Sequence, residues 1–196
     1  MFNFILRNTA QIRSTLLLCA IFLLTTSAAF AQERNWKTFS PENGAWSIFA
    51  PGEMERDETG TESLNTKGGY TYTDENGFFA VVYEDSPKWL VTFSKPFINS
   101  HYKKIRNSFL KSSKGELIKD GKFSNGKNGG REFYIKIPDG RVLDSENQIK
   151  TRYRTGRFRI FFEGKRCYML IAVLPQEEID AFAVDNYFDS FTAKQN

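Results

Sequence analysis

Apolar and polar residues alternate in several short runs, a two-residue period typical of β-strands with one buried face. The clearest hairpin joins Gly69–Thr73 to Phe78–Tyr83, with Asn76-Gly77 expected to provide the positive φ angles of a tight turn. A second, more apolar hairpin joins Gln148–Phe162 to Arg166–Leu174. Further strands are predicted at Trp36–Ser40, Ala45–Phe49, Glu116–Lys119 and Glu132–Ile137, the last ending at a turn over Pro138–Gly140.

Two segments have the longer period of amphipathic helices. Ile98, Tyr102, Ile105 and Phe109 recur at spacings of four, three and four, which predicts a helix from about Ser94 to Gly115. A final helix is predicted from about Glu177 to Phe191, with Ile179, Phe182 and Tyr187 pointing inward. Hairpins dominate, and strands do not alternate regularly with helices. We therefore expect an α+β fold, a twisted antiparallel β-sheet covered by two main helices in an α/β/α sandwich.

The first 31 residues have the pattern of a cleavable secretory signal peptide. Arg7 and Arg13 precede the apolar run Leu16–Leu24, and Ala29 and Ala31 provide small side chains before the expected cleavage point. The run is shorter than the roughly 20 apolar residues that a membrane-spanning helix needs. We therefore predict an exported protein, periplasmic or secreted, with one globular domain over residues 32–196.

The charge balance and the cysteine content bear on which partners and which stabilising bonds are plausible. Without the signal peptide, the chain has 25 lysines and arginines and 23 aspartates and glutamates, a balance that does not favour nucleic-acid binding. Cys167 is then the only cysteine, so no internal disulfide can form. It lies in an apolar strand, where a cysteine is typically a small buried hydrophobe.

No catalytic, cofactor-binding or metal-binding residues are predicted. His101 is the only histidine, and a dyad with Cys167 requires the fold to bring helix and strand together. No cluster of histidines and cysteines suggests a metal. The segment Gly121–Asn128 resembles a phosphate-binding loop, but it leads into a strand instead of the helix that would hold the anion.

A ladder of basic residues is the best candidate for binding. Lys150, Arg152 and Arg154 alternate and so share one face of a strand, and Arg157 and Arg159 continue the ladder past Gly156 if a bulge changes the parity there. Such a strip can contact an anionic lipid, a polysaccharide or an acidic partner. The alternative is that these are ordinary solvent-facing residues that protect a strand edge from aggregation.

The layout also resembles a known type of protein. The residues that carry the likeness are Trp36, Trp46-Ser-Ile48, Pro51-Gly52, the tyrosine-rich hairpin, the central helix, Gly164–Tyr168 and Phe188–Phe191. They resemble small exported bacterial proteins with a PsbP-like or DcrB-like α/β/α sandwich, which implies a non-enzymatic envelope or assembly-factor role. We expect a domain that binds a partner protein or an envelope component. The alternative is an envelope hydrolase whose acidic or His101-based site is not evident in the sequence.

Overall fold

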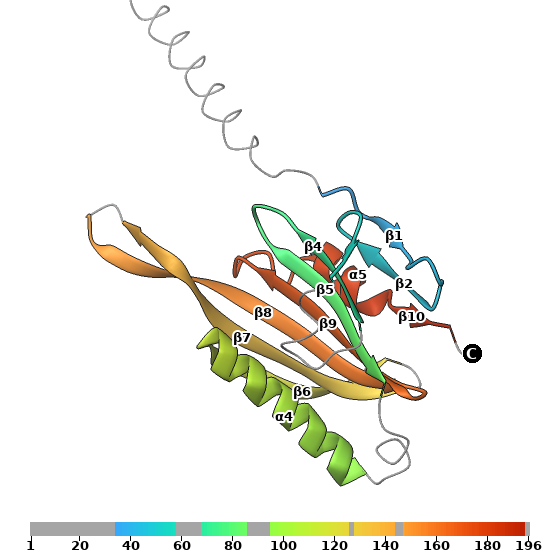
Figure 1. Cartoon of the computed structure of the whole chain (residues 1–196). Coiled ribbons are helices and arrows are strands. Elements are labelled where there is room, and N and C mark those ends of the chain that lie inside the picture. Colours follow the sequence, from blue (N-terminus) through green and yellow to red (C-terminus); the bar gives the residue numbers. More distant parts are fainter. Residues whose placement is uncertain (1–33, 58–67, 86–94, 126–127, 144–146, 195–196) are drawn as a thin grey trace, which may run out of the picture. The chain divides into compact units, whose positions relative to one another are not determined.

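A seven-stranded antiparallel sheet dominates the computed structural model, which describes residues 34–57, 68–85, 95–125, 128–143 and 147–194 (Figure 1). Its strands, in spatial order, are β3 (Glu55–Arg56), β4 (Gly68–Thr73), β5 (Phe78–Asp85), β9 (Arg166–Leu174), β8 (Ile149–Glu163), β7 (Asn128–Leu143) and β6 (Glu116–Asn125). The predicted signal peptide lies outside the described residues, and the chain from Trp36 onward forms a compact unit.

A second, smaller sheet comes from the two ends of this unit. It contains β1 (Lys37–Phe39), β2 (Trp46–Ala50) and the C-terminal strand β10 (Thr192–Ala193), with β2 in the middle. The β1–β2 hairpin confirms the two strands predicted around Pro41–Gly44, and Gly44 has the positive φ of 58° that this turn requires.

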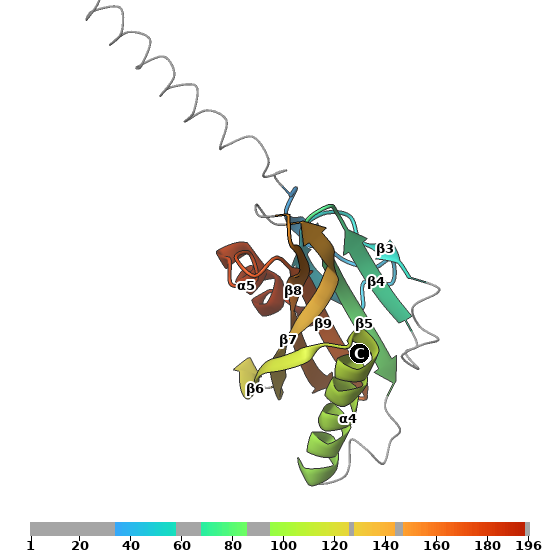
Figure 2. The same cartoon turned by 90° about the vertical axis from the view of Figure 1, so that its left-hand side faces the viewer.

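Both faces of the central part of the large sheet are covered. Helix α4 (Lys95–Ser113) covers one face. There, Tyr102 of the helix packs in one buried cluster with Phe158 and Ile160, which are alternate residues of β8. Helix α5 (Phe182–Asp189) and the small sheet cover the other face, so the two helices lie on opposite sides (Figure 2). The α+β prediction is therefore confirmed, although the sheet is the dominant element.

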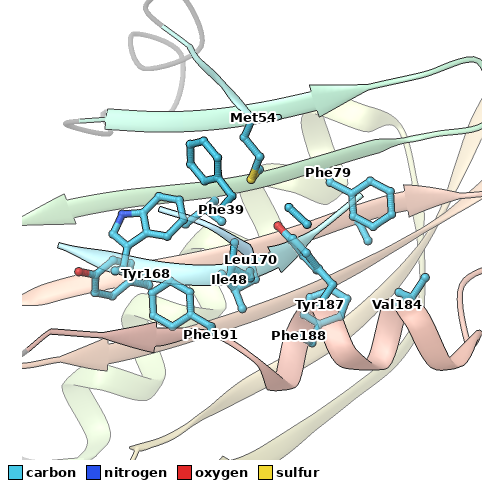
Figure 3. Close-up of a cluster of buried hydrophobic side chains, with 14 of the residues drawn as sticks. Phe39, Ile48, Met54, Phe79, Tyr168, Leu170, Val184, Tyr187, Phe188 and Phe191 are labelled. Carbon is cyan, nitrogen blue, oxygen red and sulfur yellow. The ribbon is translucent and has the colours of Figure 1, made fainter. Parts of the chain in front are cut away.

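The core under α5 is rich in aromatic residues (Figure 3). Leu170 in the central strand β9 is fully buried among them. Tyr187 is also fully buried, and its hydroxyl donates a 2.7 Å hydrogen bond to the Ala80 carbonyl of β5. This bond gives the polar end of the ring a partner and fixes α5 against the sheet.

The segments with the clearest apolar periodicity form the helix and the hairpins that were predicted for them. Helix α4 spans the predicted range, and Tyr102 in its apolar stripe is buried against the sheet. Strands β8 and β9 form the predicted hairpin, with Gly164 at a φ of 58° in the turn. The β4–β5 hairpin is also confirmed.

The structure corrects several local predictions. Asn76 and Gly77 were expected to have positive φ angles, but neither residue does. The Asp74 carboxylate closes that turn instead, because it accepts hydrogen bonds from the backbone N–H groups of both residues. Helix α5 begins only at Phe182, because a series of turns precedes it. The prediction that Phe182 points inward is wrong, since this side chain is 79% exposed. Strand β7 continues through the expected turn at Pro138–Gly140 as a bulge.

That bulge begins a projecting two-stranded arm. The β7–β8 arm consists of Pro138–Leu143 and Ile149–Arg154, which pair with each other. Strand β9 pairs with β8 only from Thr155 onward, so the arm extends past its neighbours at one end of the sheet (Figure 1).

Candidate functional site

The predicted basic ladder is divided between the two faces of the sheet. The pairing of β8 with β7 and β9 runs through Gly156 without a shift in register, so the expected bulge is not there. Lys150, Arg152 and Arg154 therefore share one face of the β7–β8 arm, as predicted. Arg157 and Arg159 lie on the other face, beneath α5.

Arg157 and Arg159 are not part of a surface strip. Their side chains are only 5% and 11% exposed, and both contact the Glu132 carboxylate of β7, at 3.2 and 2.5 Å. Arg157 also binds Asp185 at 2.6 Å, and Arg159 binds Asp189, so α5 provides one carboxylate for each guanidinium. This network fixes α5 to the sheet.

The two guanidinium groups also lie over the aromatic ring of Phe188, at 4.6 Å and 5.2 Å from its centre. Burial opposes the charge on Arg157, but hydrogen bonding to Asp185 and the charge of Glu132 keep its pKa above the ordinary value. Each guanidinium group is paired with two carboxylates inside the protein, which assigns both arginines a structural role.

The β7–β8 arm has faces of different chemistry. On the basic face, Arg152 and Arg154 both bind the Asp139 carboxylate at 2.8 Å, and Arg154 also donates to the Asn76 carbonyl. The hydrogen bond from Arg154 is the main reason that the pKa of Asp139 lies below its usual value.

The other face of the arm carries exposed apolar side chains. Leu143 and Ile149 are cross-strand partners and are 67% and 69% exposed, and Tyr153 follows on the same side of β8. Leu143 and Ile149 form an exposed aliphatic pair, whereas Tyr153 is separated from it by the cross-strand pair Arg141 and Thr151. The Lys136 ammonium group lies 4.2 Å from the centre of the Tyr153 ring. The arm thus has an exposed aliphatic pair on one face and a row of basic residues on the other, a composition suited to contact with another macromolecule.

A basic pocket of about 390 Å³ lies between α4 and strands β6 and β7. Lys103, Arg106, Lys122 and Arg131 line it around a single carboxylate, that of Asp120. Asp120 binds Arg106 and also Arg131, the latter at 2.6 Å, and so orients both guanidinium groups. With four cationic side chains and one anionic one, this pocket can accept an anionic group.

Another cluster was not predicted, although its members include the only histidine and Cys167. His101 of α4, Glu84 of β5 and Cys167 of β9 each have a ligand atom, and these three atoms lie within 4.8 Å of one another. His101 Nε2 is 2.9 Å from Glu84 Oε1. The fold therefore does bring His101 to both an acid and a thiol.

The thiol in this cluster is unsuited to nucleophilic catalysis. Cys167 is 3% exposed, and burial, together with the negative charge of Glu84, raises its pKa well above the ordinary value. The thiolate is the nucleophilic form, and a raised pKa keeps the thiol protonated at neutral pH. The cluster does not provide the activated nucleophile that a cysteine hydrolase needs.

The comparisons with known proteins show the fold. Neither a protein-family model nor a curated protein matches the sequence. Among solved structures, the chain is similar to the solution structure of cyanobacterial PsbP (CyanoP) from Synechocystis sp. PCC 6803, with a TM-score of 0.57 and 8% sequence identity over 85% of this chain and 96% of that one. A crystal structure from Bacteroides thetaiotaomicron matches with a TM-score of 0.47 and 13% identity, over 82% of this chain and 49% of that one. The fold is therefore PsbP-like.

Proposed function

We propose that this chain is an exported, non-catalytic domain that binds a partner protein through its β7–β8 arm. The observation that carries the proposal is the exposed aliphatic pair of Leu143 and Ile149, with the exposed Tyr153 further along the same face. Single exposed hydrophobic residues are common on monomeric proteins, whereas contiguous ones mark interaction surfaces. The arm also projects past the neighbouring strands, where a partner can reach both of its faces (Figure 1).

The basic face of the arm determines the kind of partner that fits. Lys150 and Arg152 are exposed on it, and Arg152 and Arg154 share one carboxylate, Asp139. This excess of positive charge favours a partner whose apolar contact surface is bordered by acidic residues. Electrostatic attraction of this kind speeds association and weakens as the salt concentration rises.

Export is the second part of the proposal and rests on the N-terminal sequence pattern. Among the described residues, no helix is both long and apolar enough to cross a membrane. The likeness to a PsbP structure contributes the fold, and a fold by itself does not fix a function. The binding role therefore depends on the arm.

The test places a photo-crosslinking amino acid at Ile149 in cells that produce the protein. We expect a discrete crosslinked product containing one partner protein. The matched control carries the crosslinker at Phe97, which is 52% exposed and lies on α4 one turn before His101, whose ring contacts Phe162 at the end of β8 opposite the arm. The Ile149 product should disappear when Leu143→Ser is added, because the partner loses half of the paired aliphatic contact.

Three outcomes would reject arm-mediated binding of a protein: no product at Ile149, the same products at Phe97, or a product that Leu143→Ser leaves unchanged. Vesicles of anionic phospholipid provide the comparison with a membrane. If wild-type protein sediments with them and Leu143→Ser does not, the arm binds lipid instead of protein. Leu143 is largely exposed, so this change should alter the free energy of unfolding by only about 0.5 kcal/mol or less.

A further inference from the structure

Three elements of the fold bring Glu84, His101 and Cys167 together. Glu84 and Cys167 are direct cross-strand partners on β5 and β9, so their side chains leave the sheet on the same face. Helix α4 packs on that face and places His101 above them. A carboxylate oxygen, an imidazole nitrogen and a sulfur atom thus converge within 4.8 Å of one another.

The imidazole of His101 has an unsatisfied polar atom that points to a missing ligand. Nε2 is buried, and it has no hydrogen-bond partner among the described residues. It lies 2.9 Å from Glu84 Oε1, but the contact lacks the geometry of a hydrogen bond. Buried polar atoms in native proteins nearly always have a partner, so this atom requires an explanation.

From this geometry we infer that Glu84, His101 and Cys167 bind a zinc ion. Zn²⁺ accepts sulfur, nitrogen and carboxylate oxygen ligands together, whereas Mg²⁺ and Ca²⁺ prefer oxygen alone. Zinc bonds of about 2.0–2.3 Å in a tetrahedron place neighbouring ligand atoms about 3.5 Å apart. In the cluster, His101 Nε2 and Glu84 Oε1 are 2.9 Å apart and all three ligand atoms lie within 4.8 Å, so binding requires side-chain rotations that even out these distances.

The charges of the proposed site also balance. On binding, the Cys167 thiol releases its proton to solvent and forms a thiolate–zinc bond, while zinc keeps its charge of +2. The thiolate and the Glu84 carboxylate neutralise the ion, and His101 binds as the neutral imidazole. Phe162 packs beside the imidazole with the ring centres 5.8 Å apart, and so restricts its rotation. Three protein ligands leave a fourth position for water or an external group.

Cobalt provides a direct test, because Co²⁺ takes the same ligands as zinc and absorbs light. The experiment uses the full chain with Cys19→Ser, so that Cys167 is the only thiol. We expect one Co²⁺ per chain, an absorption band for charge transfer from sulfur to cobalt, and loss of that band when Zn²⁺ is added. Cys167→Ser should abolish the band.

The other two ligands are tested by zinc affinity. His101→Gln and Glu84→Gln should each weaken zinc binding at least about tenfold, roughly the smallest effect seen even for residues that only support a metal ligand. The matched control is Asp85→Asn, which changes the next residue of β5, on the opposite face, where the carboxylate contacts Arg166 at 2.9 Å. That variant should bind zinc within twofold of the parent.

The inference is wrong if the parent protein shows no sulfur-to-cobalt band, or if zinc does not displace the cobalt. It is also wrong if His101→Gln and Asp85→Asn bind zinc equally. If circular dichroism shows that Cys167→Ser does not fold, the zinc affinity of His101→Gln decides the question, because the His101 side chain lies at the edge of the core. None of these outcomes depends on the crosslinking experiment, so failure of the arm proposal and failure of the zinc site are distinguishable.

Discussion

Glu132→Gln should destabilise the fold substantially, because this carboxylate neutralises two buried guanidinium groups. Glu132 is 16% exposed and lies 3.2 Å from Arg157 and 2.5 Å from Arg159. Removing one partner from a buried ion pair costs about 3–5 kcal/mol. Each arginine keeps one carboxylate on α5, so we expect the lower value, about 3 kcal/mol. In a domain of this size, that corresponds to a fall in melting temperature of about 6–12 °C.

The assay is urea denaturation at neutral pH, followed by the fluorescence of the buried Trp46. Asp189→Asn is the matched control, since it removes a carboxylate from the same network but from a side chain that is 62% exposed. Asp189 is mostly exposed and Arg159 keeps Glu132 in this variant, so the loss should be near the value of about 0–1 kcal/mol for a surface ion pair. Equal effects of the two changes, or a loss below about 1 kcal/mol for Glu132→Gln, would refute the argument that the network is buried and structural.

Three further predictions concern the core, the arm and the N-terminus. Leu170→Ala should lower the free energy of unfolding by about 3–5 kcal/mol in the same urea assay, because it leaves a cavity in the central strand. Asp139→Asn should be less stable than wild type at pH 7, and the difference should close as the pH falls below about 4. The reason is that Arg154 and Arg152 hold the pKa of Asp139 below that of the unfolded chain, so the stabilisation exists only while the carboxylate is ionised. N-terminal sequencing of exported protein should begin at Gln32, and recovery of an intact N-terminus from Met1 would contradict cleavage.

The parts of the fold that could be predicted from sequence are those with a repeating apolar pattern. Alternation in β8 and β9 placed the central hairpin correctly, and the spacing of the α4 stripe placed the helix. The last helix was predicted too long, because the acidic residues at Glu177 and Glu178 resemble a first helical turn but instead lie in turns before α5. Ile179 is nevertheless fully buried, as its apolar side chain suggested.

The buried arginines show why part of the candidate site was placed wrongly. An arginine that alternates with apolar residues in a strand suggests a solvent-facing position, and only the acids packed over Arg157 and Arg159 show otherwise. Asp185 and Asp189 are 28 and 30 residues away in the chain. One signal was available, because acids four apart share one face of a helix and can cover two alternating cations on a strand.

The cluster of Glu84, His101 and Cys167 could not be predicted for a different reason. Its formation requires β5 to pair with β9, which are not consecutive strands, in a register that sets Glu84 opposite Cys167. Local patterns do not specify either the neighbour or the register of a strand. The same limit applies to the basic pocket, where Arg106 of α4 meets Arg131 of β7 only through their common contact with Asp120.

The position of β8 allows the two proposed sites to be tested separately. This strand runs from the β7–β8 arm at Arg154 to Phe162, which is the cross-strand partner of Cys167. At about 3.3 Å per residue, those eight residues separate the arm from the zinc cluster by about 26 Å along the strand. That is more than twice the distance of about 8–10 Å over which physiological salt screens charge. The charge of a bound zinc ion therefore should not alter attraction at the arm, so a change in crosslinking at Ile149 on adding zinc would mean that the metal acts by moving the sheet.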